Sequence, residues 1–368
     1  MKSLLLAHSS RWNGETEYAA AVALAEARMG MAVTVVGPAG SRFSSEIRGA
    51  ARWLDLPRRS PAHSPFDFLW DLIWLRRLLR REEIDLLHSC RPTSHLLVAL
   101  AAPPGVPLLH LRGSSRAPAD HFLNRWLYRR MTAAVIVSSG RLVRWTIDRL
   151  RMPPERVHPI LAPVDLERFR PAAPDPALLR ELGIPPSAPV VLMVARLAPV
   201  KGHDVLVKAM GAVGREFPEA RLVLVGKPWE DQPGALLAQA RSLGLGGKVI
   251  CPGHRTDVPR FLSIASLGVM SSLGSEENSR GVGEYMAAAL PVVATMVGVV
   301  PELVADGSTG ILVPPGDTGA LGKALADLLR DPAKAKRMGE AGRRRAADLF
   351  SFAAFDRRLR SVLGPKRT

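Results

Sequence analysis

The chain has 368 residues, 47% of them hydrophobic, and its 50 lysines and arginines outnumber its 34 aspartates and glutamates, giving a formal net charge of +16. This length exceeds what one hydrophobic core usually serves, so two domains are predicted, and the apolar content excludes a disordered chain. The N-terminal apolar run is too short for a signal peptide, no stretch has the length of a membrane span, and two cysteines make no disulfide framework, so we expect a cytoplasmic protein.

The first predicted elements alternate between strand and helix. A buried strand at 2–7, a polar loop at 8–16, an alanine-rich helix at 17–29 and a strand at 32–37 form a βαβ unit. Open α/β sheets bind ligands at the carboxyl ends of their strands, so this loop is a candidate site. Gly14 would allow a ligand to approach the backbone closely, although an Asn-Gly pair is equally common in tight turns.

The segment 66–81 (FDFLWDLIWLRRLLRR) is amphipathic and ends in an arginine cluster. Aromatic residues beside arginines occur in helices that lie on membrane surfaces. The interpretation we prefer is a helix that packs in a βαβ crossover, with its C-terminal arginines favoured by the helix dipole. Further strands of this half are predicted at 84–88, 107–111, 133–138 and 157–161, which places His88 and His110 at strand ends.

A cluster of prolines between residues 163 and 176 marks the expected linker between the domains. The alternation then resumes, with strands predicted at 190–194, 221–226, 249–251, 292–293 and 311–313. The helices predicted in this half are one of about a dozen residues opened by Lys201-Gly202, and others at 233–243, 284–290, 320–329 and 332–349. A basic helix is predicted at 352–363.

The stretch from Ser271 to Glu302 holds most of the functional information. Glu276 lies in a run of small polar residues, and Glu284 opens a segment of helix-forming composition that Pro291 ends before a β-branched run. A loop entering a helix offers unpaired backbone N–H groups and a positive dipole end, which suit a phosphate. Carboxylates in the same loop suit sugar hydroxyls, so the combination predicts a nucleotide-sugar site.

Several landmarks of the second half stand in the order typical of one enzyme family. They are 195–202 (ARLAPVKG), 223–226 (VLVG), Gly253 before a polar loop, Glu276-x7-Glu284, Ala287-x3-Pro291-Val-Val, Gly298-x2-Pro301-Glu302, and Gly307-x2-Gly310 with Val313-Pro314. As a set they resemble the retaining, GT-B-fold glycosyltransferases of the group 1 type, over nearly all of 157–350. The first half matches more loosely, and its segments at 85–88, 110–113, 124–128 and 164–169 resemble a bacterial subgroup that acts in cell-surface glycan or lipopolysaccharide assembly.

The resemblance implies an α/β fold with two Rossmann-like domains facing across a cleft. An acceptor-side domain is expected at 1–168 and a nucleotide-sugar-binding domain at 169–350. A C-terminal helix at 351–368 is expected to cross back and pack on the first domain.

The resemblance also implies roles for individual residues. Arg196 and Lys201, on a strand-to-helix loop, would neutralise the departing diphosphate. Glu276 would hold the hydroxyls of the transferred sugar and Glu284 the ribose hydroxyls. The remaining residues expected to bind the donor are Gly14, Asn278, Ser279, Arg280, His254 and Arg255. In the first domain His110 is the candidate for contact with the acceptor or sugar and His88 the alternative, although a histidine at a strand end is more often structural.

The sequence departs from the family pattern at several positions. Glu277 stands where the family commonly has glycine and adds a negative charge beside the phosphate loop. Ala289 and Val299 also replace glycines, and Ala162-Pro163 stands where Asn-Gly is frequent. These changes bear on the identity of the donor more than on activity, since both acids and both cations remain.

We therefore expect a hexosyl- or heptosyltransferase that needs neither metal nor cofactor and moves a sugar from a nucleoside diphosphate to a glycan or lipid-linked acceptor. The alternatives are a nucleotide-sugar epimerase of the same fold and a non-catalytic basic protein that binds acidic lipid or nucleic acid. The net charge would suit peripheral contact with the anionic inner face of a membrane, although an arginine-rich composition alone explains it equally well, and nucleic acid is not an expected partner.

Overall fold

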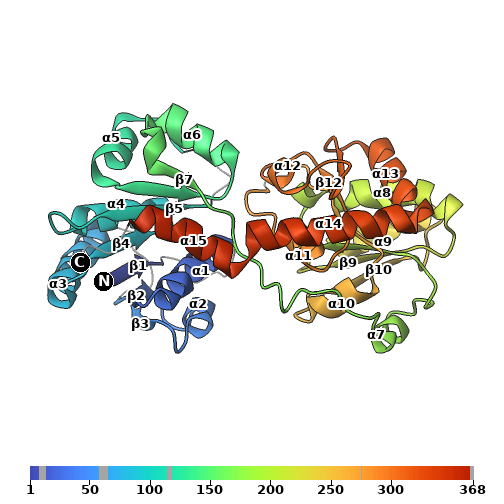
Figure 1. Cartoon of the computed structure of the whole chain (residues 1–368), viewed down its shortest axis with the longest axis horizontal. Helices are drawn as coiled ribbons and strands as arrows, with labels where there is room; N and C mark the ends of the chain where they lie inside the picture. The colour runs from blue at the N-terminus through green and yellow to red at the C-terminus, as the bar shows by residue number, and fades with distance from the viewer. Residues whose placement is uncertain (8–13, 58–64, 114–117, 275, 365–368) are drawn as a thin grey trace. The chain divides into compact units, whose positions relative to one another are not determined.

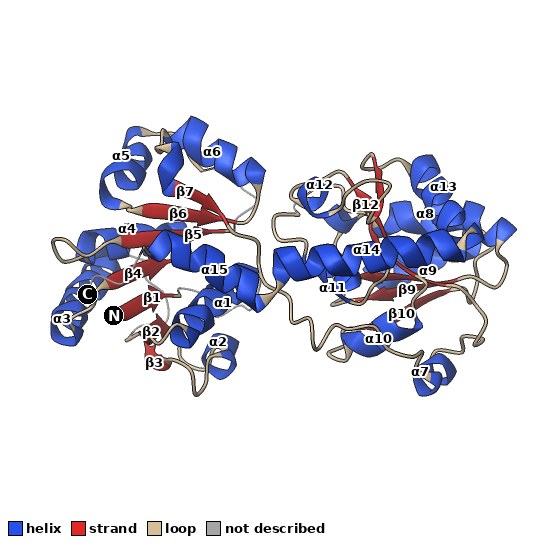
Figure 2. Cartoon of the chain, viewed as in Figure 1, coloured by secondary structure: helices blue, strands red, loops and turns tan. Residues whose placement is uncertain are grey.

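The structure, a computed structural model, describes the chain except residues 8–13, 58–64, 114–117, 275 and 365–368. It divides into two compact units (Figure 1). Unit 1 comprises Met1–Pro163 and Phe352–Thr368, and unit 2 comprises Val164–Ser351. Each unit has one parallel β-sheet with helices on both faces, an α/β architecture in both cases (Figure 2).

The sheet of unit 1 has seven parallel strands in the order β3-β2-β1-β4-β5-β6-β7. Their bounds are β1 (Lys2–Leu6), β2 (Ala32–Gly37), β3 (Arg52–Asp55), β4 (Leu86–Ser89), β5 (Leu108–Arg112), β6 (Ala134–Val137) and β7 (Val157–Pro159). The strand order reverses between β1 and β4, where Leu5 is in register with His88. Ligands of such sheets bind at this reversal, beyond the carboxyl ends of the strands.

Side chains of the unit 1 strands alternate between two hydrophobic clusters, one on each face of the sheet. Leu4 and Leu6 pack into the cluster of α3 (Pro65–Glu82), α4 (Pro92–Ala101), α5 (Phe122–Met131) and α6 (Gly140–Leu150). Leu5 packs into the opposite cluster, with α1 (Gly14–Arg28), α2 (Arg42–Glu46) and α15 (Phe352–Leu363). A short 3-10 helix (Pro154–Arg156) precedes β7.

The C-terminal helix α15 packs on unit 1. The ring of Phe355 meets that of Tyr18 of α1 edge to face, with centroids 5.9 Å apart. Arg28 at the end of α1 donates two hydrogen bonds, of 2.9 and 2.7 Å, to the carboxylate of Asp356. The predicted return of this helix to the first domain is therefore confirmed.

The sheet of unit 2 has six parallel strands in the order β10-β9-β8-β11-β12-β13. Their bounds are β8 (Val190–Val194), β9 (Arg221–Val225), β10 (Val249–Gly253), β11 (Leu267–Met270), β12 (Val292–Thr295) and β13 (Gly310–Val313). The helices are α7 (Pro176–Glu181), α8 (His203–Glu216), α9 (Gln232–Ser242), α10 (Val258–Ile264), α11 (Arg280–Ala287), α12 (Val300–Leu303), α13 (Thr318–Arg330) and α14 (Pro332–Phe350), with a 3-10 turn at Pro199–Lys201. The order reverses between β8 and β11.

Candidate active site

An ion pair joins the two loops at the strand-order reversal of unit 2. Lys201 follows β8 and Glu276 follows β11, and the Lys201 Nζ donates to the Glu276 Oε1. The hydroxyl of Ser272 donates to the same oxygen. The side chain of Glu276 is 4% exposed and that of Lys201 is 18% exposed. Two of the predicted site residues therefore meet where an open sheet binds its ligand.

Two glycines allow these loops to approach one another. Gly202 has a φ of +66°, and a Cβ there would lie 2.1 Å from the carbonyl oxygen of Ser271. Gly298 has a φ of +60°, and its Cβ would lie 2.0 Å from the carbonyl oxygen of Glu276. That oxygen also accepts a 2.7 Å hydrogen bond from the Val299 amide. The backbone of Glu276 is thereby fixed from two sides, and any side chain at either glycine would displace it.

The second predicted acid lies on α11 and is paired within that helix. The Arg280 Nε donates to the Glu284 Oε1 at 2.7 Å, one helical turn away. Burial raises the pKa of Glu284, and the positive charges of Arg280 and Arg168 oppose that rise. Asn278 and Ser279 precede the first turn of α11, with Ser279 in the left-handed region at a φ of +34°. The helix begins at Arg280, so the prediction that it begins at Glu284 was wrong by one turn.

Arg196 extends from the loop after β8 and contacts an aromatic ring. Its guanidinium lies 4.8 Å from the centroid of the Trp229 ring, beyond the neighbouring strand β9. The Trp229 side chain is itself exposed, at 42%. Sequence reasoning missed Trp229, because the pairing of β8 with β9 that brings it to Arg196 is a long-range contact.

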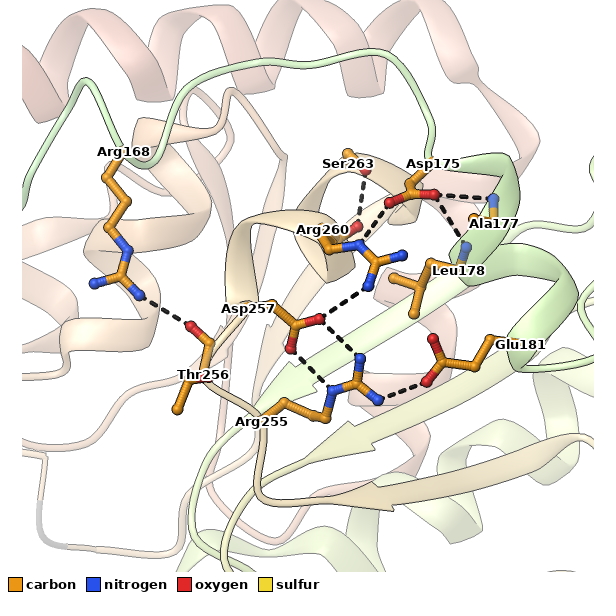
Figure 3. A network of polar contacts seen from close by, with 10 residues as sticks. All are labelled: Arg168, Asp175, Ala177, Leu178, Glu181, Arg255, Thr256, Asp257, Arg260 and Ser263. Atoms are coloured by element: carbon orange, nitrogen blue, oxygen red, sulfur yellow. Dashed lines mark hydrogen bonds and ion pairs between the residues drawn. The ribbon is translucent and has the colours of Figure 1, made fainter.

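Arg255, another predicted donor-binding residue, lies in a different set of contacts (Figure 3). Its guanidinium donates to Asp257 at 2.9 and 2.8 Å and to Glu181 of α7 at 2.6 Å. The hydrogen bonds from Arg255 hold the pKa of Asp257 well below its usual range. Arg260 extends the network to Asp175. These side chains therefore connect α7 to the loop before α10. The donor-binding role of Arg255 and its exposed neighbour His254 stays a prediction.

His110 of unit 1 is buried in the middle of β5, so its predicted position at a strand end was wrong. Only 1% of the residue is exposed, its Nδ1 lies 2.9 Å from the Ser89 hydroxyl, and its ring stacks on His95 at 4.0 Å between centroids. Burial, together with His95 and the charge of Arg112, lowers the pKa of His110 well below its ordinary value, so the ring is neutral at pH 7. Its predicted contact with acceptor or sugar stays a prediction.

The alternative histidine, His88, is fully buried on β4. Its Nε2 lies 2.6 Å from the Glu26 Oε1, and the Glu26 Oε2 accepts a 2.6 Å hydrogen bond from Ser3. These three side chains bind one another inside the core, which is the structural role expected of most strand-end histidines. Among the described residues the buried Nδ1 of His88 has no hydrogen-bond partner.

Gly14 is the first residue of α1, and the greater part of the predicted loop before it lies outside the described residues, as does Ser275 in unit 2. Glu15, which follows Gly14, has its pKa raised by burial, and the charges of Arg91 and Arg112 oppose that rise. These three charged groups gather at the strand-order reversal of unit 1, and none of them was predicted as a site residue.

Family profiles match both halves of the chain. Residues 12–168 match the profile described as Glycosyltransferase Family 4, and residues 175–345 match the profile described as Glycosyl transferases group 1. The first half of the chain is therefore similar to one glycosyltransferase family, and the second half is similar to the group 1 glycosyltransferases. The fold agrees, because the crystal structure of a glycosyltransferase from Rickettsia africae superposes with a TM-score of 0.86 over 100% of this chain and 99% of that chain, at 19% identity. The structure of HepE from Anabaena in complex with UDP and glucose gives a TM-score of 0.80 at 22% identity, over 99% of each chain.

Curated proteins that this chain resembles carry more specific names. A GDP-mannose-dependent alpha-(1-6)-phosphatidylinositol monomannoside mannosyltransferase of Mycolicibacterium smegmatis is 34% identical over 55% of each chain. A D-inositol 3-phosphate glycosyltransferase of Segniliparus rotundus is 30% identical over 77% of this chain and 62% of the relative. The chain spans about half to three fifths of the length of these relatives.

Proposed function

We propose that this protein transfers a sugar, with retention of anomeric configuration and without a metal ion, from a nucleoside-diphosphate sugar to a glycan or lipid-linked acceptor. The observation that carries the proposal is the Lys201–Glu276 pair at the strand-order reversal of unit 2, with Arg196 and Glu284 on neighbouring segments. A nucleotide-sugar needs cations for its diphosphate and carboxylates for its hydroxyls, and this edge of the sheet presents both.

In the proposed reaction Lys201 and Arg196 stabilise the negative charge that grows on the departing diphosphate. Glu276 accepts hydrogen bonds from the transferred sugar and steadies positive charge at its anomeric carbon. Lys201 and Ser272 both donate to the Glu276 Oε1, which fixes the carboxylate in advance of substrate. The leaving phosphate takes the proton of the acceptor hydroxyl, so the chain need not supply a general base.

One of the relatives named above supports a lipid-linked acceptor. The names of the two relatives give phosphatidylinositol monomannoside and D-inositol 3-phosphate as what they act on. The similarly folded WaaG, described as a glycosyltransferase involved in lipopolysaccharide biosynthesis, has a TM-score of 0.73 at 17% identity. We extend only the general class, an acceptor of the cell envelope, to this protein.

The decisive experiment is donor binding by a variant of the ribose-binding acid. A panel of nucleotide-sugars is first screened by thermal shift, because a specific ligand stabilises the folded state. Calorimetry with the selected donor should then show no detectable binding to Glu284→Ala. Glu216→Ala, which removes an exposed acid of the same unit that pairs with Arg330, is the matched control. Unchanged donor affinity in Glu284→Ala would refute the assignment.

Product analysis separates this proposal from an epimerase of the same fold. With donor alone, an epimerase would convert the sugar nucleotide, whereas a transferase yields at most slow hydrolysis. With acceptor present, NMR of the product should show the anomeric configuration of the donor, and activity should persist in a metal chelator. Conversion of the donor without acceptor would favour the epimerase.

A further inference from the structure

Helix α3 exposes an apolar half and a basic half on the same face. Phe66, Leu69, Trp70 and Ile73, at helical spacing, are 78%, 53%, 59% and 37% exposed. Leu72, Leu75 and Leu79 on the other side of the helix are buried in the core. In the second half of α3 the exposed face continues with arginines, among them Arg77, Arg80 and Arg81. A helix that only packed in a crossover would not need large apolar side chains on its solvent face.

Helix α5 repeats this arrangement on a shorter scale. Phe122, Leu123 and Trp126 in its first half are 76%, 56% and 44% exposed. Arg129 and Arg130 in its last turn are exposed as well. Two helices more than forty residues apart in sequence therefore share one pattern, apolar at the N-terminal end and cationic at the C-terminal end. Single exposed apolar residues are common on protein surfaces, but seven of them on two helices are not.

The topology places the two apolar halves along one side of unit 1. Both helices cover the same face of the sheet, since the buried residues of α3, α4 and α5 belong to one hydrophobic cluster. α3 connects β3 to β4, and α5 connects β5 to β6, in a sheet whose strands are all parallel. A crossover helix begins where its strand ends, so the N-terminal halves of both helices lie toward the carboxyl edge of the sheet. Leu96 of α4, between them, is 40% exposed.

We propose that this side of unit 1 docks on an anionic lipid bilayer. The apolar edge, defined as Phe66, Leu69, Trp70, Phe122, Leu123 and Trp126, enters the boundary between head groups and acyl chains. The basic ends of α3 and α5 then lie at the level of the lipid phosphates. The proposal concerns the place at which the protein works and does not depend on which sugar it transfers.

The distance between the apolar and basic parts of α3 agrees with docking on a bilayer. Seven residues separate Trp70 from Arg77, about 10 Å along a helix axis, and interfacial helices insert roughly 5–10 Å into the boundary region. Arginine binds phosphate strongly, and tryptophan favours the membrane interface. A second copy of the chain fits less well, because two faces that both carry arginine clusters repel one another. No helix among the described residues has the length and hydropathy needed to cross a bilayer.

Vesicle binding by the full chain tests the proposal. Co-sedimentation should show binding to vesicles of phosphatidylcholine with phosphatidylglycerol, weak binding to phosphatidylcholine alone, and weakening by salt. Trp70→Ser with Trp126→Ser should lower the partition coefficient at least tenfold. Arg80→Gln with Arg81→Gln should lower it roughly thirtyfold, because each basic residue near an anionic surface contributes about 1 kcal/mol.

Matched variants in unit 2 serve as controls. Lys336→Gln with Arg337→Gln removes two exposed charges of α14, and Leu243→Ser removes an apolar side chain that is 41% exposed. Both controls should retain the wild-type partition coefficient. A spectroscopic control is Trp70→Phe with Trp126→Phe, which should bind vesicles almost as well as wild type but lose most of the fluorescence quenching by brominated lipid.

Three results would overturn the proposal. One is equal binding to neutral and anionic vesicles, and another is an equal loss of binding in the unit 2 controls. The third is a dimer in light scattering that the serine variants dissociate, which would make the apolar edge a protein interface. Donor affinity is measured on every variant and should not change, so failure of vesicle binding and failure of the proposed glycosyl transfer are separate outcomes.

Discussion

In unit 2 a lysine and a glutamate form an ion pair at the strand-order reversal. In unit 1 two neutral histidines, His95 of α4 and His110 in the middle of β5, stack on one another. The side chain of Glu276 is 4% exposed and is paired with Lys201. His95 and His110 are buried without an acid against their rings, and burial lowers the pKa of His95 to about 3. At these two places the units bury polar groups in different ways, although unit 1 also buries an acid, Glu26, against His88 of β4.

The difference has consequences for stability and for function. A charged pair depends on its partner, so removing one member leaves a buried charge. A neutral histidine pair depends on pH, because protonation of a buried ring is unfavourable. The Lys201–Glu276 pair of unit 2 should therefore be sensitive to substitution of either member, whereas the histidine pair should make unit 1 sensitive to acid.

The largest effect expected is that of Lys201→Ala. The substitution leaves Glu276 buried without its cation, which should lower the free energy of unfolding of unit 2 by about 3 kcal/mol. Urea unfolding at pH 7 measures the change. The double variant Lys201→Met with Glu276→Gln should recover most of the stability, yet neither variant should bind the donor.

The control for this prediction is Lys208→Ala. The Lys208 Nζ lies 3.9 Å from the Asp204 Oδ2, and the two side chains are about half exposed, at 54% and 49%. Pairs of this kind contribute between about 0 and 1 kcal/mol. If Lys201→Ala lowered the free energy of unfolding no more than Lys208→Ala, the Lys201–Glu276 pair would not be a buried ion pair in solution. The contrast between the two units would then fail.

Acid should destabilise unit 1 more than unit 2. The pKa values of His95 and His110 are lowered in the folded state, so their full contribution is present above the unfolded pKa of about 6.5 and is lost as pH falls below it. Between pH 7 and pH 5.5 the two histidines should lower the free energy of unfolding of unit 1 by about 2 kcal/mol. In unit 2 only His203 among the described histidines has a lowered pKa, to about 4. The raised pKa values of Glu284 in unit 2 and of Glu15 in unit 1 act in the opposite direction, and the lowered pKa of His158 adds to the acid sensitivity of unit 1.

Hydrogen exchange followed by mass spectrometry can separate the two units in this comparison. Peptides from β5 and α4 should lose protection on acidification, after correction for intrinsic rates, more than peptides from β8 and β11. His95→Gln should flatten the pH dependence of the unit 1 peptides. Equal losses in the two units would mean that the histidine pair does not govern acid stability.

Most of the fold followed from local sequence patterns, and the exceptions have physical causes. Strands of pure apolar composition, such as β8 and β2, have the predicted bounds, as does α15. The strand β3 was not predicted, because it is a four-residue edge strand whose residues are only partly buried. The start of α11 was misplaced because Gly281 and Gly283 are poor helix formers. Packing against the Val194 carbonyl and the Val164 side chain requires glycine there and overrides that propensity.

The sequence predicts the residue types of the candidate site but not their pairing. The order of acids and cations in unit 2 predicts Lys201, Glu276 and Glu284 as site residues, and their roles stay predictions. Sequence alone could not show that Lys201 binds Glu276 or that Arg255 is held by Asp257 and Glu181, because each contact depends on which loops the sheet brings together.

A substitution of Ala289, which lies shortly after α11, tests whether the backbone of unit 2 is strained at this residue. Ala289 has a φ of +57°, a left-handed conformation that costs a residue with a Cβ roughly 1–2 kcal/mol. Ala289→Gly should therefore raise the free energy of unfolding by roughly 0.5–1 kcal/mol after the entropy of glycine is subtracted. Ala288→Gly, at a φ of −80°, should lower it. Urea unfolding measures the free energy of unfolding of both variants. A lower value for Ala289→Gly than for the wild type would show that the backbone at Ala289 is unstrained.

The smallest effect expected is that of Trp229, whose ring lies under the exposed guanidinium of Arg196 at 4.8 Å. An exposed cation–π contact contributes about 0.5–1 kcal/mol, so Trp229→Ala should barely change stability. Because the ring holds Arg196 in one place on the surface of unit 2, the variant should instead weaken donor binding by roughly three- to fivefold. Trp229→Phe should restore most of the affinity, since it keeps an aromatic face beneath the guanidinium. Calorimetry on Trp229→Ala, Arg196→Ala and the double variant measures the coupling: additive losses would mean that Trp229 contacts the donor by itself, and a double loss no larger than that of Arg196→Ala would make it a positioning residue.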